Sequence, residues 1–489
     1  MRKNKKAVFA CAALAVLVIA LAGLFIYIRS EPDFSLSPEK VVRLTEKGFV
    51  PARLVVQQGD TVTFENDLQR EAWPASSPHP THDIYPAFDP RQPVPPGASW
   101  SFTFQLPGVW LYHDHLASDL EGQVVVLNAK GDFVNTACEN KDLPTVQCFQ
   151  NKVLSALDTG GLDAALDEMS TLYESEPAFK DSCHSIAHSL GKEAYHLFEK
   201  GKKINLTGKT SYCSYGFYHG FMEEMLQISG DFEQARAFCA EAGKTLATES
   251  QNAEGACYHG IGHGTVDGSD PRMWGDAEAL VTPGIVMCDK VDPTEPHFYR
   301  CLSGAFNALA IIYINNEYGL TLPTADPFAV CSNWKEFRIA NPCYQEMNTV
   351  LMKVTGGSLS KTIGLVEKIS DLQYAKLAMT SAAGVIPSYF ASPSAENFTK
   401  AINDCHAADK DLVISCINGI PSGIMEFGTP GKEYMAAIEF CSSKLLTEDE
   451  RDNCMRVVFG GVRAYYPPEK QAAICATVEE KYRENCIRP

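Results

Sequence analysis

The spacing of the cysteines constrains the fold of this chain more than any other feature of its sequence. All but one of the 17 cysteines lie beyond residue 130, and they recur along the chain as near pairs. A high, even number of cysteines without a Cys-x-x-Cys motif argues against zinc ribbons and indicates structural disulfides formed in an oxidising compartment. The predicted bridges are Cys138–Cys148, Cys239–Cys257, Cys288–Cys301, Cys331–Cys343, Cys405–Cys416, Cys441–Cys454 and Cys475–Cys486, with Cys183 and Cys213 left to pair with each other.

The residues around these cysteines have the periodicity of helices and are rich in Ala, Leu, Glu and Lys. The second cysteine of a pair often begins a Cys-x-x-Gly sequence, as at Cys213, Cys257, Cys301 and Cys416. A glycine one turn into a helix lets a neighbouring helix approach closely. We therefore expect residues 130–489 to form an all-α, solenoid-like helical-repeat domain of hairpins linked by disulfides.

The first 30 residues have the pattern of a membrane anchor. Four Lys or Arg residues within the first six positions precede an uncharged run over residues 7–28, which is about the length that a helix needs to cross a bilayer. Positive charges before such a run keep that end in the cytoplasm. The sequence predicts a cytoplasmic tip and transmembrane helix over residues 1–30, with the bulk outside the cytoplasm, in the periplasm or at the cell surface. A cleaved signal peptide is the alternative.

Composition narrows the class of partner. A chain of 489 residues with 45% hydrophobic and 21% charged residues is a folded protein with two or more cores. Its net charge of -18 is concentrated beyond the basic N-terminal tip. Such an acidic surface repels phosphate backbones, so we expect no nucleic-acid partner.

The sequence predicts β-strands in residues 31–129. Runs of β-branched and aromatic residues alternate with Gly-Asp and Pro-Gly turns, which is typical of a small β-sandwich or barrel. The predicted strands cover residues 41–44, 53–56, 61–64, 101–104 and 124–127.

Part of this region resembles the cupredoxin family. The resemblance lies in residues 48–51 (Gly-Phe-Val-Pro), in residues 55–66, and in residues 108–126, which contain His113 and His115. It spans about residues 39–128 and implies a Greek-key β-sandwich whose loops hold copper.

The departures from that family decide which kind of copper site is expected. A blue-copper site requires a cysteine thiolate, and residues 31–129 contain no cysteine. Leu120 stands near the usual axial Met, and Ala72-Trp73-Pro74 occupies the place where the first His often lies. His113 and His115 are instead similar to the paired histidines of multicopper oxidase domains, which bind copper through imidazole alone.

A second pair, His79 and His82, lies in a Pro-rich loop of the same region. Four imidazoles suit Cu(II), with Zn(II) as the alternative ion. On a strand, His113 and His115 would point to one face and share one metal. The competing interpretation is that His82 and His115 only hydrogen-bond across the loop. Three carboxylates are expected to orient the rings: Asp83, Asp89 and Asp114.

The helical part resembles no known family, but three of its cysteine-led segments carry histidines. In each segment a His is followed four residues later by a His or a Glu, which places both side chains on one helical face. Stacked helices would bring the pairs together as ligands for one or two transition metals. Structural hydrogen bonding, or a proton or ligand pocket, remain alternatives. The residues concerned are His184, His188, His219, Glu223, His259 and His263.

Together these patterns predict a membrane-anchored, extracytoplasmic copper-binding protein. Its enzymatic form would be a copper-dependent oxidoreductase in which the β-region passes copper or electrons to the helical histidines. Its non-enzymatic form would capture or store copper. A third possibility is a helical scaffold that binds a protein partner. The sequence identifies no catalytic residue, so these alternatives stay open.

Overall fold

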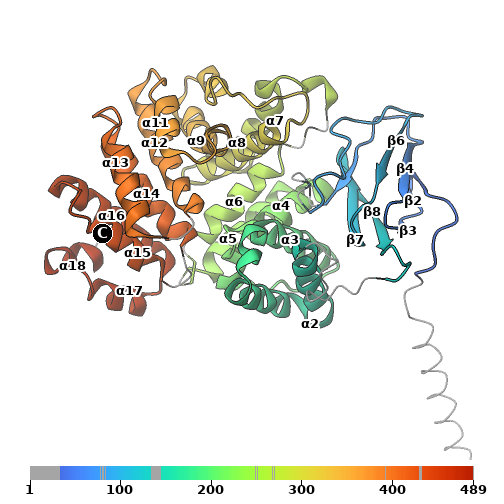
Figure 1. Cartoon of the computed structure of the whole chain (residues 1–489), viewed down its shortest axis with the longest axis horizontal. Coiled ribbons are helices and arrows are strands. Elements are labelled where there is room, and N and C mark those ends of the chain that lie inside the picture. The colour runs from blue at the N-terminus through green and yellow to red at the C-terminus, as the bar shows by residue number, and fades with distance from the viewer. Residues whose placement is uncertain are drawn as a thin grey trace, which may run out of the picture.

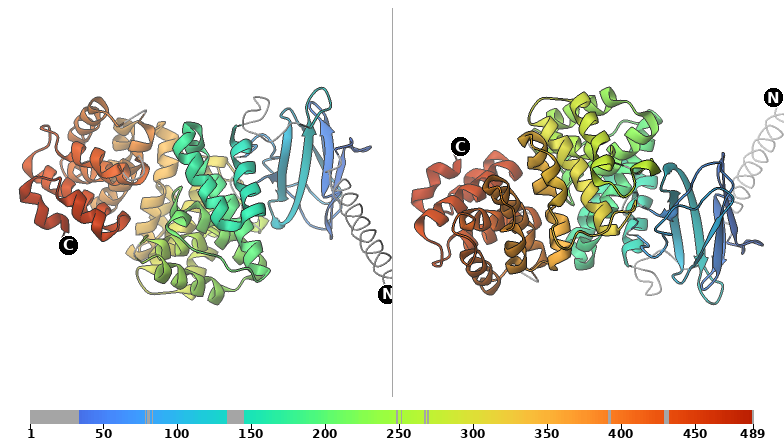
Figure 2. Two further views of the ribbon diagram at one scale, coloured as in Figure 1. Left: turned by 90° about the horizontal axis from the view of Figure 1, so that it is seen from below. Right: turned by 90° about the horizontal axis from the view of Figure 1, so that it is seen from above.

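The computed structural model describes residues 34–487, with gaps at residues 78, 80–81, 83, 134–144, 248, 251, 267, 269, 391–392 and 429–431. Eight strands of the described residues form a β-sandwich at one end of the molecule, and helices extend from it to the C-terminal end (Figures 1 and 2). The predicted order, a β region followed by a large helical region with disulfides, is confirmed.

The sandwich consists of two four-stranded sheets. Their strand orders are β2-β1-β4-β6 and β3-β8-β7-β5, and the second sheet faces the helices (Figure 1). Strands β1 and β4 pair in parallel, as do β3 and β8, while the other pairs are antiparallel. The strands are β1 (Val41–Thr45), β2 (Gly48–Val50), β3 (Arg53–Gln57), β4 (Thr61–Asn66), β5 (Pro74–Ser76), β6 (Ser99–Thr103), β7 (Gly108–Asp114) and β8 (Ala117–Leu127).

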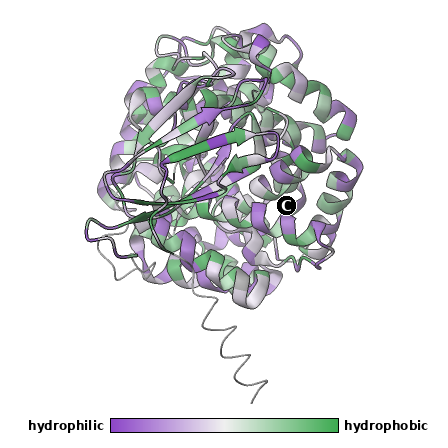
Figure 3. Ribbon diagram, turned by 90° about the vertical axis from the view of Figure 1, so that its right-hand side faces the viewer, coloured by the Kyte–Doolittle hydropathy of each residue, from purple (hydrophilic) through white to green (hydrophobic). Residues whose placement is uncertain are grey.

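All five predicted strand runs fall on observed strands, namely β1, β3, β4, β6 and β8. The reason is visible in β4, where exposed or half-exposed side chains alternate with buried ones along the whole strand. Figure 3, viewed from the sandwich end, shows hydrophilic and hydrophobic residues interspersed along the strands. The buried residues meet in an aromatic core between the sheets that includes Phe64, Phe88, Trp110 and Tyr112.

The helical region begins at Thr145, after the last strand has ended at Leu127. The α-helices are α2 (Thr145–Ser175), α3 (Cys183–Glu199), α4 (Gly216–Ser229), α5 (Phe232–Thr245), α6 (Ala253–His263), α7 (Ala277–Val291), α8 (His297–Asn315), α9 (Phe337–Glu346), α10 (Asn348–Thr355), α11 (Leu359–Val366), α12 (Leu372–Val385), α13 (Ala395–His406), α14 (Val413–Phe427), α15 (Glu433–Cys441), α16 (Glu448–Tyr465), α17 (Pro468–Cys475) and α18 (Glu480–Ile487). Short 3-10 helices are η1 (Pro177–Asp181), η2 (Gly208–Ser211), η3 (Pro271–Met273), η4 (Ala329–Asn333) and η5 (Ile386–Tyr389).

Successive helices pack on one another along the molecule. Helix α3 contacts α4, α4 contacts α6 and α6 contacts α8, and further along α12 contacts α14 and α14 contacts α16. Disulfides join the helices as the cysteine spacing predicted, and Cys148 is also disulfide-bonded, whereas Cys138 lies outside the described residues. The confirmed bridges are Cys183–Cys213, Cys239–Cys257, Cys288–Cys301, Cys331–Cys343, Cys405–Cys416, Cys441–Cys454 and Cys475–Cys486.

Glycines allow the helix backbones to touch, as expected from the Cys-x-x-Gly sequences. A Cβ atom on Gly220 of α4 would overlap the carbonyl oxygen of His188 on α3. In the same way, a Cβ atom on Gly304 of α8 would overlap the carbonyl oxygen of His259 on α6. Because these contacts involve the backbone of candidate ligands, they fix the distances between the histidine-bearing helices.

The predicted transmembrane helix is not supported and the fold class is corrected in this respect. Residues 1–30 lie outside the described residues. Within the part of the chain that the structure describes, no helix is both long and apolar enough to cross a membrane. The predicted localisation as a single-pass membrane protein is corrected for the same reason. The disulfides do indicate an extracellular, oxidising environment.

Candidate metal centres

The four histidines of the β-region come together at the sheet that faces the helices. His79 and His82 lie in the loop after β5, and His113 lies on β7. His115 lies in the turn between β7 and β8, after a register shift at His113 and Asp114, so the prediction that a strand carries both histidines is wrong for His115. The bulge redirects the chain, and both rings still face the same site.

The four rings form a compact, buried group, which we call the four-histidine site. One nitrogen from each ring lies within 4.8 Å of one nitrogen from each of the others. His79 Nδ1 is 3.3 Å from His113 Nε2, and His82 Nε2 is 2.9 Å from His115 Nδ1. No ring is more than 6% exposed. Four imidazole nitrogens at this spacing fit a copper or zinc ion.

Two of the rings are oriented by partners on their outward nitrogens. His82 Nδ1 is 2.7 Å from Asp89 Oδ2, and a carboxylate in that position holds the ring proton on Nδ1. His115 Nε2 is hydrogen-bonded to the hydroxyl of Tyr318. Both arrangements leave the inward nitrogen to face the centre of the site. The predicted role of Asp89 as an orienting acceptor is therefore supported by its contact with His82.

The other two carboxylates that were expected to orient the rings are Asp114 and Asp83. Asp114 accepts hydrogen bonds from the backbone N–H groups of Trp73 (2.7 Å) and Leu116 (3.3 Å) and pairs with Arg70, so it shapes the loops and contacts no ring in the described hydrogen bonds. Asp83 lies outside the described residues. Leu120 packs against the sandwich core.

Burial keeps three imidazoles of the site, those of His79, His113 and His115, in the neutral form that binds metals. It lowers the pKa of His79 to about 3, with the charge of Glu223 opposing this shift and that of His82 adding to it. The pKa values of His113 and His115 lie well below the ordinary value, chiefly because of burial and then because of the neighbouring rings.

Residues of the helical region close the four-histidine site. Trp73, which precedes β5, packs with Trp274 and Tyr318 at ring-centroid distances of 5.9 and 5.6 Å and is part of the core of the helices. Tyr318 has φ of 48°, a left-handed conformation that costs a bulky residue roughly 1–3 kcal/mol and is characteristic of functional sites. Sequence reasoning missed Tyr318 because no local motif connects it with His115.

Glu317 also approaches the site from the helical region. Its Oε1 atom is 3.9 Å from His82 Nδ1 and 3.8 Å from Arg91. Burial, and then the nearby charge of Asp89, raise the pKa of Glu317 to about 8. His82, Asp89 and Glu317 together form another buried group with metal-ligand spacing.

The six candidate residues of the helical region converge as predicted, and we call them the helical histidine cluster (His184, His188, His219, Glu223, His259 and His263). Ligand nitrogens of His219, His259 and His263 lie within 4.8 Å of one another. The ring of His219 is centred 5.1 Å from that of His184. Glu223 joins His188 to His263, with oxygen–nitrogen distances of 2.8 and 3.2 Å. That these residues bind a metal stays a prediction.

The charges in this cluster favour a carboxylate at its centre. Burial alone would raise the pKa of Glu223, but His188 and then His263 lower it below its ordinary value. The pKa values of His219 and His259 lie well below normal, mainly because of burial. The cluster therefore combines the neutral rings of His219 and His259 with one buried negative charge.

The two histidine groups are neighbours. Glu121 on β8 is the register partner of His113, and its side chain lies 2.6 Å from Lys192 of α3. Lys192 is in turn 3.3 Å from Glu224, which adjoins Glu223 on α4. The helices that carry the helical histidine cluster are thus held against the strand pair that carries the four-histidine site.

The remaining histidines have ordinary structural partners. His297 lies 2.8 Å from Asp292, His406 lies 3.1 Å from Glu450, and His196 lies 3.3 Å from Glu224. Nine of the 12 histidines therefore belong to the two groups, a concentration that packing alone does not require.

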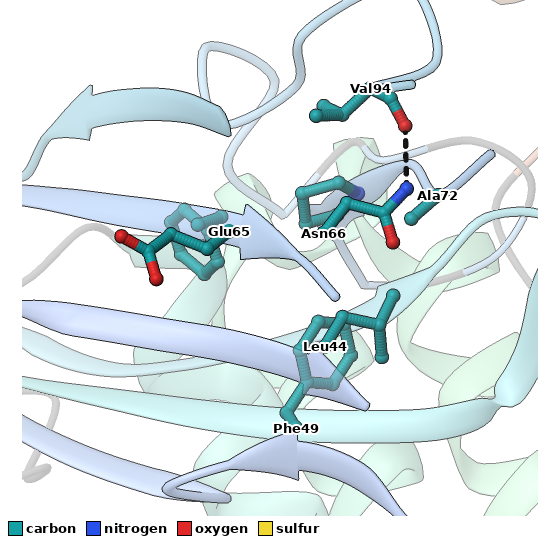
Figure 4. Close-up of a pocket in the computed structure, with 8 residues that line it drawn as sticks. Leu44, Phe49, Glu65, Asn66, Ala72 and Val94 are labelled. Atoms are coloured by element: carbon teal, nitrogen blue, oxygen red, sulfur yellow. Dashed lines mark hydrogen bonds between the residues drawn. The ribbon is translucent and has the colours of Figure 1, made fainter. Parts of the chain in front are cut away.

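A small pocket inside the sandwich has no comparable chemistry (Figure 4). It is lined mainly by apolar residues, and Asn66 at its wall donates to the carbonyl of Val94 at 2.8 Å. None of the candidate ligands lines it. The pocket therefore results from side-chain packing. The fold and the two histidine groups together define the chain as a candidate metal-binding protein.

No protein-family model and no curated protein matches the sequence. Among solved structures, the chain is similar to a Cu(I) form of a methionine-to-alanine mutant of amicyanin and to an oxidised methionine-to-leucine mutant, at 20% and 21% identity. Each match covers 20% of this chain and 87% of the amicyanin chain, with a TM-score of 0.15. The similarity to amicyanin is weak, and the metal site is defined by the residues described above.

Proposed function

We propose that this chain is an extracytoplasmic copper-binding protein that holds copper through His79, His82, His113 and His115. The observation that carries the proposal is the convergence of four buried imidazole nitrogens within 4.8 Å of one another. A scaffold without a metal function would have little use for such a group, because burying four neighbouring imidazoles is costly unless all their nitrogens are satisfied. His113 Nδ1 has no hydrogen-bond partner among the described residues.

The surroundings favour capture or storage of copper over catalysis. A bound copper ion would supply one-electron redox chemistry, but catalytic metal sites keep a coordination position open to substrate. Here four protein ligands surround the centre, all are buried, and Trp73 and Tyr318 pack on the rim, with ring centroids 4.8 and 5.1 Å from that of His115. This closed geometry suits an ion that is held and not one that binds a substrate.

Metal analysis of the purified chain tests the proposal. We expect copper to bind without an intense blue absorption band, because residues 31–129 contain no cysteine to supply a thiolate ligand. Replacing His113 and His115 with Ala should remove the ion from this site, whereas the control variant His406→Ala should bind as the wild type does. Retention of all bound copper by the double variant would overturn the assignment. A wild-type chain that binds no copper would instead favour a scaffold function.

A further inference from the structure

The helical histidine cluster has a preorganised geometry that the helices alone do not explain. The rings of His219 and His263 are centred 4.7 Å apart, and those of His219 and His259 are 4.9 Å apart. They lie on α4 and α6, which contact each other and are each tied at their start by a disulfide. The later disulfide-linked helices have the same close packing without such histidines, so the scaffold does not depend on them.

Hydrogen-bond partners determine which ring nitrogen carries the proton in His259 and in His263. The Ser303 hydroxyl donates to the carbonyl of Arg300 at 2.9 Å, so its oxygen accepts from His259 Nδ1–H at 2.8 Å. The proton of His259 is therefore on Nδ1, and Nε2 has a lone pair available for a metal ion.

The same reasoning applies to His263. The amide nitrogen of Asn307 donates to Glu346 at 3.1 Å, so the amide oxygen accepts from His263 Nε2–H at 2.8 Å. This leaves the lone pair of His263 Nδ1 directed toward Glu223 Oε1, which is 3.2 Å away and also only accepts. Two acceptors facing each other in a buried site are satisfied by a cation, which is either a proton on His263 Nδ1 or a metal ion beside it.

A third buried atom without a partner lies nearby. His219 Nδ1 is buried and has no hydrogen-bond partner among the described residues, and the same holds for His263 Nδ1 and Glu223 Oε1. Buried polar atoms in folded proteins nearly always have partners, so several unpartnered polar atoms in one cluster favour a binding site for a positive ion.

The cluster can be reached from solvent. His184, whose ring is 5.1 Å from that of His219, is exposed, and His259 is half-buried. The deeper residues His219, His263 and Glu223 are each only 5% exposed. The histidines of the cluster thus form a path from the exposed ring of His184 to the buried ligands His219 and His263.

From this geometry we propose that His219, His259 and His263 bind a second transition-metal ion, with Glu223 supplying the compensating negative charge. Imidazole ligands with one carboxylate suit copper or zinc. This site is separate from the four-histidine site, and it gives the chain two ions in adjacent positions, the outer one accessible through His184.

The test counts metal ions in the full chain after separate loading with Cu(II) and with Zn(II), followed by gel filtration and elemental analysis. The wild type should bind two ions of at least one of these metals. The variant His219→Ala/His259→Ala should bind one, and His113→Ala/His115→Ala should bind one. The matched control His297→Ala/His406→Ala should still bind two, because its rings lie outside both groups.

The design separates failure of this proposal from failure of the four-histidine site. If His113→Ala/His115→Ala binds no ion, or if His219→Ala/His259→Ala still binds two, the second site is refuted. A wild-type chain that binds a single ion, lost only from the His219→Ala/His259→Ala variant, would refute the four-histidine site instead. Should that variant fail to fold, X-ray absorption of the ion left in His113→Ala/His115→Ala decides the matter: nitrogen ligands at about 2.0 Å support the site, and oxygen ligands alone overturn it.

Discussion

Replacing Asp89 with Asn should reverse the tautomer of His82 at the four-histidine site. Asp89 Oδ1 accepts from Trp73 Nε1 at 2.8 Å and from the backbone N–H of Arg91 at 2.7 Å, while Oδ2 faces His82 Nδ1. In the Asn variant the amide oxygen keeps the two N–H donors, so the NH₂ group faces His82. Because an NH₂ group only donates, His82 Nδ1 must accept, and the ring proton moves to Nε2.

The expected loss of copper affinity in the Asp89→Asn variant follows from the position of that proton. His82 Nε2 is the atom that lies 2.9 Å from His115 Nδ1, on the side where the metal would bind. Binding then requires the ring to return to the unfavourable tautomer. Loss of a partner that orients a metal-binding His typically weakens affinity about 10–100-fold, or roughly 1.4–2.8 kcal/mol. We expect copper affinity to fall by this amount while the fold is retained, since Asn is nearly isosteric with Asp.

Competition with a copper chelator of known affinity measures the effect on the full chain. The matched control is Asp60→Asn, an aspartate of the same sandwich whose side chain pairs with Lys40 and the backbone of Gln57, away from the histidines. Its copper affinity should equal that of the wild type. If Asp89→Asn binds copper within about twofold of the wild type, His82 is not held by Asp89 in the copper-bound protein and the reasoning is wrong.

Three further outcomes follow from the structure. Gly220→Ala should lower the free energy of unfolding by about 1–3 kcal/mol or more because the new Cβ overlaps the neighbouring helix backbone, whereas Gly364→Ala, with open space around it, should be neutral or stabilising; urea unfolding distinguishes them. Replacing Cys288 and Cys301 with Ser should cost about 2–4 kcal/mol in the same assay, and an unchanged midpoint would contradict this. Burial raises the pKa of Glu346 from 4.5 to about 7, so the folded chain binds a proton that the unfolded chain has lost, and stability should fall as pH rises through this range; Glu346→Gln should flatten that part of the pH–stability curve.

The disulfides were predictable because they depend on local spacing. A helical hairpin brings the end of one helix beside the start of the next, so two cysteines near that turn are close whatever the rest of the fold does. This holds for Cys239 and Cys257, whose Cα atoms are 5.3 Å apart. The pairing of Cys183 with Cys213 was found by elimination, since every other described cysteine had a nearer partner.

The convergence of the helical histidines was predictable for a related reason. His219 and Glu223 share one face of α4, and His259 and His263 share one face of α6. The first His of each pair follows a cysteine, six residues after Cys213 and two after Cys257, and the glycines hold the two helices in close contact. The hydrogen-bond partners on α8 could not be predicted, because Ser303 and Asn307 are unremarkable in sequence.

Local patterns were less reliable where the backbone is irregular. A strand was expected to carry both His113 and His115, but the register shift after His113 places His115 in a turn. A sequence pattern of period two contains no signal for a single extra residue in a strand. The N-terminal anchor was an interpretation of hydropathy alone, and the described helices do not support it.

The completion of the four-histidine site depends on contacts that no local pattern encodes. The hydroxyl of Tyr318 reaches His115 across 203 positions of sequence, and Trp73 packs into the core of the helices instead of the core of its own sandwich. The loop that carries Tyr318 holds Asn316 and Tyr318 in left-handed conformations, with φ of 57° and 48°, which persist only when the surrounding structure enforces them. The helical region is therefore more than an attachment to the sandwich. It supplies the wall that buries the rings, the hydroxyl that orients His115, and the adjacent cluster of histidines, so the proposed metal site lies at the interface between the sandwich and the helices.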